Sequence, residues 1–311
     1  MDYRRLGDSG LKVSEIGLGC NNFGMRIDQD ETTRVVNAAI DAGINFFDTA
    51  DIYGGTQSEV MLGQALGDRR KDIILATKFA MPLSKDPYQR GGSRRYIMKA
   101  VEASLTRLGT DYIDLYQMHQ PDPDTPIEET LSALDDLVTQ GKVRYLGNSN
   151  FTGWQIADAD WTARSDHLSR FVSAQNNYSL LERKVETEVN PACQRFGLGM
   201  LPYFPLASGL LSGKYHRGEA PAEGTRLAAW GRAGAQSLND QNFDRIDKLS
   251  AWAAERGHAI LDLAFAWLLG NPVVSSVIAG ATRPEQVAAN AATASWKLTP
   301  DEVKDVTKLA A

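Results

Sequence analysis

Residues 73–119 open with Ile73-Ile-Leu-Ala-Thr-Lys78 and close with Ile113-Asp-Leu-Tyr-Gln-Met-His119, two runs rich in β-branched and aromatic residues. Such runs are typical of buried strands. Between them, Arg94 to Leu108 carries apolar residues at spacings of three and four, which indicates one buried face of a helix. A strand, a helix and a second strand in this order predict a βαβ unit with two parallel strands.

The same alternation continues in both directions, from about residue 14 to residue 295, without a linker rich in proline, glycine or serine. The other helix patterns include Asp30–Ala42, Pro126–Gln140, Lys184–Arg195, Phe243–Arg256 and Pro284–Ala294. The predicted strands are Glu15–Gly19, Asn45–Ala50, Ile73–Lys78, Ile113–His119, Tyr145–Ser149, Phe171–Gln175, Gly199–Phe204 and Ser275–Ala279. Eight such pairs in one uninterrupted chain favour an α/β fold of the closed (β/α)8 (TIM barrel) type, with residues 1–311 as a single domain.

An open doubly wound sheet is the alternative architecture, but it usually carries a G-x-G-x-x-G motif after its first strand. Here that position reads Gly17-Leu-Gly-Cys-Asn-Asn22, with Asn22 in place of the third glycine. Ahead of the barrel, the turn-forming Gly7-Asp8-Ser9-Gly10 predicts a small N-terminal β-hairpin that could plug the barrel floor. Residues 208–241 form a long glycine- and alanine-rich loop of a kind that usually serves function, and a C-terminal helix ends the fold.

The composition excludes several classes of partner. Lysine and arginine number 33 against 39 acidic residues, a net charge of -6 without runs of like charge, so neither nucleic acid nor an anionic membrane is expected. The first residues lack the apolar core of a signal peptide, and the only two cysteines, Cys20 and Cys193, suit a reducing cytoplasmic compartment. The four histidines show no spacing typical of metal ligands, so no metal is expected.

Reactive side chains gather at three successive strand ends, where a (β/α)8 barrel places its catalytic groups. The second strand ends near Asp48 with Tyr53 just after it, the third ends at Lys78, and the fourth ends at His119. We expect Lys78 to stabilise the phenolate of Tyr53 and so lower its pKa, and Asp48 to keep Lys78 charged. His119 would orient a substrate oxygen. Such a set suits protonation of an oxygen that gains charge as hydride reaches a carbonyl carbon, so it predicts a carbonyl reductase with a nicotinamide cofactor.

Any one of these groups, taken alone, is more often structural, either in an ion pair or in a satisfied core hydrogen bond. Four complementary groups at neighbouring strand ends favour the catalytic interpretation. Asp51, by contrast, is interpreted as a turn residue or a helix-capping acid. A barrel glycosidase would need two carboxylates facing one bond, and only Asp48 is placed for that chemistry.

From Tyr3 through the C-terminal helix, the sequence resembles the aldo-keto reductase superfamily. The resemblance implies NADPH-dependent reduction of aldehydes and ketones, with a small carbonyl compound as substrate, and puts the family's catalytic tetrad on Asp48, Tyr53, Lys78 and His119. Potassium-channel β subunits are similar in layout, so a cofactor-binding regulatory subunit with little turnover is the alternative function. The matching stretches are Arg5-Leu-Gly-Asp-Ser-Gly-Leu-Lys-Val-Ser14, Gly43-Ile-Asn-Phe-Phe-Asp-Thr-Ala50 with Tyr53-Gly54, Ala76-Thr-Lys78, Asp111-Tyr-Ile-Asp-Leu-Tyr-Gln-Met-His119 and Gly141-Lys-Val-Arg-Tyr-Leu-Gly147.

The same resemblance implies where the nicotinamide end of NADP(H) would bind. Ser149, Asn150 and Gln175 would hold the nicotinamide amide, and the ring of Tyr203 would stack on the nicotinamide. Taken alone, Tyr203 is equally well interpreted as a core aromatic residue and Asn150 as a turn residue.

Two further segments resemble the phosphate-binding parts of the family. The pyrophosphate loop, where small residues admit backbone N–H groups and cations add charge, would comprise Pro205, Leu206, Ala207, Ser208, Gly209, Lys214 and Arg226. The adenosine-phosphate site, which opens the helix after the eighth strand, would comprise Gly280, Thr282, Arg283, Gln286 and Asn290. Contacts of Arg283 with a 2′-phosphate would favour NADP over NAD, whereas the alternative role for Arg283 is a solvated helix-start residue.

Overall fold

The computed structural model describes residues 1–223 and 225–311, and the side chains of residues 226, 232 and 233 lie outside the described part. Among the described residues, eight parallel strands form one sheet in the order β10-β3-β4-β5-β6-β7-β8-β9. They are β3 (Ile16–Gly19), β4 (Phe46–Asp48), β5 (Ile74–Phe79), β6 (Ile113–Met118), β7 (Val143–Ser149), β8 (Phe171–Gln175), β9 (Gly199–Met200) and β10 (Val277–Gly280). Each of the eight predicted strand runs overlaps one of them.

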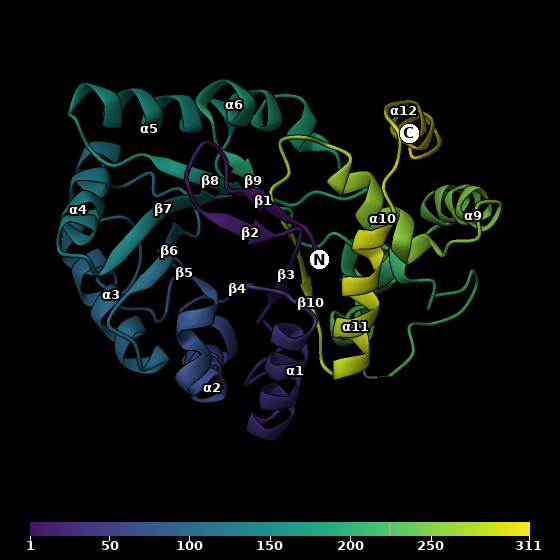
Figure 1. The fold of residues 1–311 in the computed structure, drawn as a ribbon, viewed down its shortest axis with the longest axis horizontal. Helices are drawn as coiled ribbons and strands as arrows, with labels where there is room; N and C mark the ends of the chain where they lie inside the picture. The colour runs from purple at the N-terminus through teal and green to yellow at the C-terminus, as the bar shows by residue number, and fades with distance from the viewer. Residues whose placement is uncertain (224) are drawn as a thin grey trace.

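The sheet curls back on itself and closes between β9 and the segment that leads into β10. Met200 and Val274 form a parallel bridge, and the Met200 N–H donates to the carbonyl of Val273 over 2.8 Å. Ser275 N–H returns a bond to the Met200 carbonyl over 3.0 Å. These bonds confirm the predicted (β/α)8 barrel, with its helices arranged around the outside of the sheet (Figure 1).

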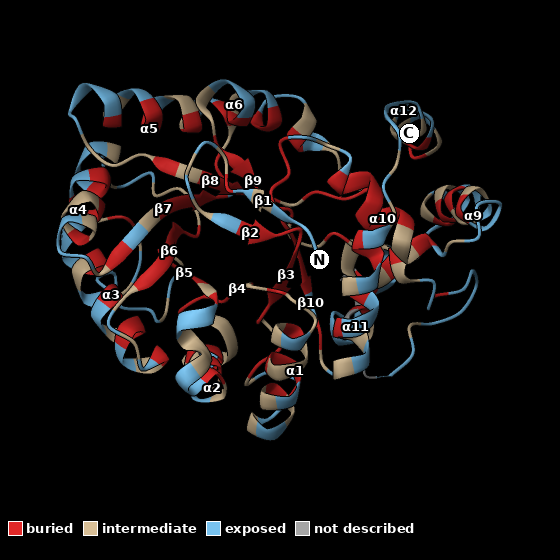
Figure 2. Cartoon of the chain, in the orientation of Figure 1, coloured by how far each residue is buried: buried red, intermediate tan, exposed pale blue. Residues whose placement is uncertain are grey.

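The helices cover the outward face of the strands, and Figure 2 shows their inner faces buried and their outer faces exposed. The α-helices are α1 (Gln29–Asp41), α2 (Gln57–Leu66), α3 (Arg94–Leu108), α4 (Ile127–Thr139), α5 (Gly153–Ser165), α6 (Val189–Phe196), α7 (Arg226–Ala229), α8 (Arg232–Gln236), α9 (Asp240–Ala254), α10 (Ile260–Leu269), α11 (Pro284–Ala292) and α12 (Pro300–Leu309). Short 3₁₀ turns are η1 (Tyr53–Thr56), η2 (Gly67–Asp72), η3 (Lys184–Glu186), η4 (Ala207–Ser212) and η5 (Thr293–Ser295). No helix of the described chain is long and apolar enough to cross a membrane.

One helix predicted as continuous is divided in the structure. The pattern over Lys184–Arg195 predicted a single helix, whereas η3 ends at Glu186 and α6 starts at Val189. Pro191 explains the division, because proline lacks the N–H that a helix interior needs and is tolerated only in a first turn. Helix α6 begins two residues before Pro191, so that proline falls in its first turn.

The N-terminal hairpin closes the floor of the barrel, as predicted. Strands β1 (Tyr3–Arg5) and β2 (Lys12–Ser14) pair antiparallel and lie across the barrel opening (Figure 1). Leu6 follows β1, is fully buried, and packs in the barrel interior with Phe46, Leu115 and Leu201. Gly7 has a φ of +56°, and a Cβ there would lie 2.4 Å from the carbonyl oxygen of Gly197. The hairpin therefore sits against the strands that lie farthest from it in sequence.

Replacing Leu6 by alanine removes the apolar side chain that fills the floor. We expect the Leu6→Ala protein to lose about 2–5 kcal/mol of unfolding free energy, the usual range for a buried leucine. Urea unfolding followed by far-UV circular dichroism measures this loss. Lys12→Ala, an exposed position on the same hairpin, serves as the control. Equal urea midpoints for Leu6→Ala and Lys12→Ala would show that the buried side chain of Leu6 contributes little to the unfolding free energy.

Candidate active site

The predicted catalytic side chains meet at the carboxyl end of the barrel. Asp48 is the last residue of β4, Lys78 lies in β5, His119 follows β6 directly, and Tyr53 opens η1. Lys78 Nζ donates to Asp48 Oδ2 over 2.6 Å, to the Thr49 carbonyl over 2.8 Å, and to Tyr53 Oη over 3.4 Å. The ammonium thus has three acceptors for its three N–H donors, and the predicted Lys78–Tyr53 neighbourhood is present.

Lys78 and Asp48 form a buried ion pair, with the Lys78 side chain 0% exposed and that of Asp48 4% exposed. Burial lowers the pKa of Lys78, but the negative charge of Asp48 and the contact with Tyr53 outweigh burial, so the net pKa is raised. Lys78 is therefore a permanent cation at neutral pH.

The phenol of Tyr53 departs from the expectation of a lowered pKa. Desolvation raises its pKa more than Lys78 lowers it, and Asp48 raises it further, so the net pKa lies above the usual value. Lys78 acts in the predicted direction, but the low polarity of the site dominates. Tyr53 consequently holds its proton at neutral pH, which is the state that a proton donor requires.

His119 lies edge-on to Tyr53, with ring centroids 5.6 Å apart and an interplanar angle of 81°. Burial and the charge of Lys78 lower the pKa of His119 to about 3, so its imidazole is neutral. Its Nδ1 is buried without a hydrogen-bond partner among the described residues. A neutral imidazole next to a phenol can hydrogen-bond an uncharged oxygen without adding a second cation.

Two glutamine amides complete the surroundings of Asp48. Gln117 Nε2 and Gln175 Nε2 each donate to Asp48 Oδ1 over 3.0 Å. We expected Gln175 at the site from the family resemblance, but we did not single out Gln117. The sequence did carry a signal for Gln117. Leu115 and Gln117 are two residues apart on β6 and therefore share its inward face. An amide at such a position needs a polar partner inside the barrel.

Asp51 lies in the turn between β4 and η1, which agrees with the turn interpretation. Its side chain is fully buried, and its Oδ2 accepts a hydrogen bond from the Tyr96 hydroxyl of α3 over 3.1 Å. Burial and the nearby carboxylate of Glu59 raise the pKa of Asp51 to about 7. Glu59 itself is held by the hydroxyl of Thr77 and the guanidinium of Arg107. A second buried carboxyl group therefore lies on the loop between Asp48 and Tyr53.

The raised pKa of Asp51 makes the stability of the protein depend on pH. The folded state holds this proton up to about pH 7, whereas the unfolded chain releases it near its ordinary pKa of 3.8. The contribution of Asp51 to the unfolding free energy therefore falls as pH rises from about 4 to 7. The Asp51→Asn side chain cannot ionise. Its unfolding free energy, relative to that of the wild type, should therefore increase by on the order of 2 kcal/mol between about pH 5 and pH 8.

Urea unfolding at about pH 5 and about pH 8 measures that difference. His119 acts in the opposite direction between about pH 3 and 6.5, because its pKa is lowered by folding, but it is present in both proteins and cancels. Asp158→Asn, at an exposed site on α5, is the control for a simple change of net charge. Parallel pH profiles for wild type and Asp51→Asn would contradict the raised pKa.

The residues expected to bind nicotinamide lie together at the ends of β7, β8 and β9. Ser149 Oγ donates to the carbonyl of Gln175 over 2.8 Å, and Asn150 Nδ2 donates to Ser149 Oγ over 3.1 Å and to the His119 carbonyl over 2.9 Å. Tyr203 Oη donates to Asn150 Oδ1 over 2.8 Å. The bond from Asn150 to His119 joins this group directly to the tetrad.

The expected pyrophosphate loop has an unusual backbone. Pro205 and Leu206 lead into η4, where Ala207, Ser208 and Gly209 have φ values of 45°, 60° and 101°. Lys214 folds back over Gly209, and a Cβ on Gly209 would lie 2.9 Å from Lys214 Nζ. A bare stretch of backbone next to an ammonium is a suitable cradle for an anion. Arg226 is the first residue of α7, and its side chain lies outside the described residues.

The expected adenosine-phosphate residues gather where β10 meets α11. Thr282 donates from its N–H and its Oγ1 to Gln286 Oε1, over 2.7 Å and 3.1 Å. Arg283 precedes Pro284 at the N-terminus of α11, is exposed, and has no ion pair with any described residue. A Cβ at Gly280 would lie 3.1 Å from Asn22 Nδ2, so this strand end lies against the loop after β3. Asn290 is buried in α11.

These three groups lie on one side of the barrel mouth. They follow β7, β8, β9 and β10, which are neighbours in the closed sheet, while the tetrad follows β4, β5 and β6. Among the described residues, no cluster of three histidine, cysteine, aspartate or glutamate side chains could hold a metal ion. The residues expected to bind the cofactor therefore lie beside the tetrad at the same end of the barrel.

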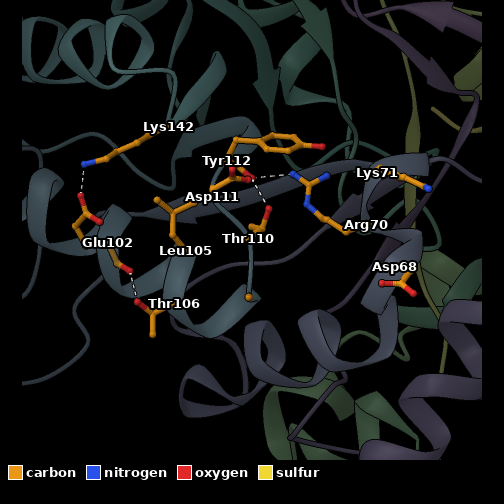
Figure 3. Close-up of a pocket in the computed structure, with 11 residues that line it drawn as sticks. Asp68, Arg70, Lys71, Glu102, Leu105, Thr106, Thr110, Asp111, Tyr112 and Lys142 are labelled. Atoms are coloured by element: carbon orange, nitrogen blue, oxygen red, sulfur yellow. Dashed lines mark hydrogen bonds and ion pairs between the residues drawn. The ribbon is translucent and has the colours of Figure 1, made fainter.

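A hollow of about 770 Å³ lies at the other end of the barrel (Figure 3). Its lining residues precede β5, β6 and β7, whereas the tetrad follows β4, β5 and β6. Lys142 in this hollow pairs with Glu102, and Arg70 donates to the carbonyl of Tyr112 over 2.8 Å. The hollow is open surface formed by paired charges and has no part in the site described above.

Comparison with known proteins agrees with this geometry. The model of the Aldo/keto reductase family matches residues 15–311. An uncharacterized oxidoreductase, YrpG, of Bacillus subtilis is 41% identical over 92% of this chain and 89% of its own. A probable voltage-gated potassium channel subunit beta of Oryza sativa is 38% identical over 93% of this chain and 90% of its own length. Versiconal hemiacetal acetate reductase of Aspergillus parasiticus is 33% identical over 98% of this chain and 95% of its own length.

The family match and the relatives named as oxidoreductase and reductase support an oxidoreductase, with carbonyl reduction as the general chemistry. The chain belongs to the aldo/keto reductase family, whose members generally use NAD(P)H.

Proposed function

We propose that this protein reduces an aldehyde or ketone to the alcohol with NADPH, reversibly, and that Tyr53 donates the proton. The observation that carries the proposal is the contact of 3.4 Å between Lys78 Nζ and Tyr53 Oη, with Lys78 itself held by Asp48 over 2.6 Å. A protonated phenol beside a buried cation is suited to protonating an oxygen that becomes an alkoxide. The substrate is a small carbonyl compound, and the proposed compartment is the cytoplasm, where the two buried free cysteines would stay reduced.

The proton moves from Tyr53 Oη to the substrate oxygen, and the negative charge passes to the phenolate. Lys78 stabilises that phenolate, and Asp48 keeps the ammonium charged and directed at Tyr53. A nicotinamide held by Ser149, Asn150 and Gln175 would supply the hydride for the carbonyl carbon. His119, neutral and next to Tyr53, orients the substrate oxygen through a hydrogen bond.

The residues at the barrel mouth fit such a cofactor. Lys214 above the bare backbone of Gly209 would hold the pyrophosphate, and Ser149, Asn150 and Gln175 would hold the nicotinamide amide. Preference for NADPH over NADH rests on Arg283, whose exposed guanidinium stands at the N-terminus of α11 without an ion pair among the described residues. Helix N-termini and arginine both favour phosphate groups.

A cofactor-binding regulatory subunit with little turnover is the second candidate. It is favoured by the names of relatives from Oryza sativa, Arabidopsis thaliana and Schizosaccharomyces pombe, which are described as potassium channel β subunits. Lys78 contacts both Asp48 and Tyr53, and His119 lies edge-on to Tyr53, which supports turnover. NADPH binding without consumption across a panel of carbonyl compounds would favour the regulatory role.

Tyr53→Phe should abolish reduction because it removes the transferable proton. We expect the rate of NADPH oxidation with an activated aromatic aldehyde to fall at least about 100-fold, the usual minimum effect of a general acid. The dissociation constant for NADPH should stay within about twofold of the wild type, since phenylalanine fills the same space. Tyr116→Phe, at a buried tyrosine whose hydroxyl has no partner among the described residues, is the matched control. A wild-type rate in Tyr53→Phe would overturn the assignment of the donor.

Arg283→Ala should weaken the binding of NADPH more than the binding of NADH. Loss of a charge-assisted bond to the 2′-phosphate, about 1.5 kcal/mol, should raise the Michaelis constant for NADPH about tenfold. The constant for NADH, which lacks that phosphate, should change little and serves as the internal control. Equal changes for both cofactors would remove Arg283 from the phosphate site.

A further inference from the structure

Gln117 is a buried polar side chain at the tetrad to which the proposed chemistry gives no role. It is fully buried on the inward face of β6. Its Nε2 donates to Asp48 Oδ1 over 3.0 Å, and its Oε1 accepts from Gln175 Nε2 over 3.4 Å. Gln117 thus connects the carboxylate of the tetrad with a residue expected to meet the nicotinamide amide.

The charge of Asp48 fixes the direction of both amides. A carboxylate only accepts hydrogen bonds, so each glutamine must present its NH₂ group to Asp48 Oδ1. The oxygen of Gln117 then accepts a hydrogen bond from the second N–H of Gln175. Both donors of Gln175 are therefore used within the barrel, and its own oxygen is the end left for a ligand.

The packing around Gln117 holds it in this position. Gly147 of β7 stands opposite Gln117 in register, and a Cβ there would lie 3.0 Å from Gln117 Cγ. The absent side chain of Gly147 leaves the space that Gln117 occupies. Because Gln117 is confined, the hydrogen bond that it accepts also restricts the Gln175 amide before a ligand binds. Less conformational entropy of Gln175 is then lost on binding.

We propose that Gln117 is a positioning residue that holds the Gln175 amide with its oxygen outward, so that the site selects a cofactor able to donate an N–H, as the nicotinamide carboxamide can. This inference rests on the proposed function, because it takes the carboxamide as the group that meets Gln175. Gln117 acts only through Gln175 and Asp48 and touches no reacting atom.

Binding of two cofactors tests this role without relying on turnover. NADPH carries a carboxamide, whereas its reduced 3-acetylpyridine analogue has a carbonyl but no N–H at that place. Quenching of protein fluorescence gives the two dissociation constants for wild type, Gln117→Met and the control Tyr116→Phe, which alters the next residue on the outward face of β6. Methionine keeps the volume of glutamine but can neither orient nor satisfy Gln175.

We expect wild type and Tyr116→Phe to prefer NADPH over the analogue, and Gln117→Met to lose about fivefold of that preference, the factor for one hydrogen bond. Gln117→Asn, whose amide is one carbon shorter, should show the same loss and replaces Gln117→Met if that variant does not fold. An unchanged ratio, or equal weakening of both cofactors, overturns the positioning role. Failure of the wild type to bind NADPH at all would instead refute the proposed function, and this inference with it.

Discussion

The buried ion pair between Lys78 and Asp48 is the interaction on which the rest of the site depends. Removing two charges from water costs several kcal/mol per ion, and only a complete set of hydrogen bonds offsets that cost. Here the set is complete: Lys78 has three acceptors, and Asp48 receives Lys78 on one oxygen and two amides on the other. An incomplete set would favour neutral forms of both groups and leave no cation beside the phenol.

The state of every neighbour is influenced by this pair. The cation of Lys78 opposes protonation of His119, and the same cation limits how far burial raises the pKa of Tyr53. The carboxylate of Asp48 dictates which way the amides of Gln117 and Gln175 turn. Burial keeps the imidazole neutral and the phenol protonated, while the charged pair reinforces the first effect, limits the second and sets the orientation of two amides.

Sequence alone predicted the strands and the tetrad, because strand ends in a closed barrel converge regardless of what lies between them. It did not single out α10, because eight buried residues in Ile260–Leu269 form an apolar run without a helical period. It predicted the turn at Asp51 but not the burial of its carboxyl group, because the partner Tyr96 lies on α3, 45 residues further along the chain. It overlooked Gln117 for a similar reason, since its partners Asp48 and Gln175 come from distant strands. Long-range partners of buried polar groups are what local patterns cannot show.

The floor hairpin has a consequence for the order of folding. Arg4 donates to the carbonyl of Val274 over 3.0 Å, and Ser275 Oγ donates to the carbonyl of Arg5 over 2.9 Å, each across 270 residues. Contacts between positions so far apart cannot form on the ribosome until nearly the whole polypeptide has emerged, and such contacts slow folding. The floor hairpin, although synthesised before the strands it meets, is thus among the last parts of the barrel to reach its final place, and until then the barrel interior stays open from below.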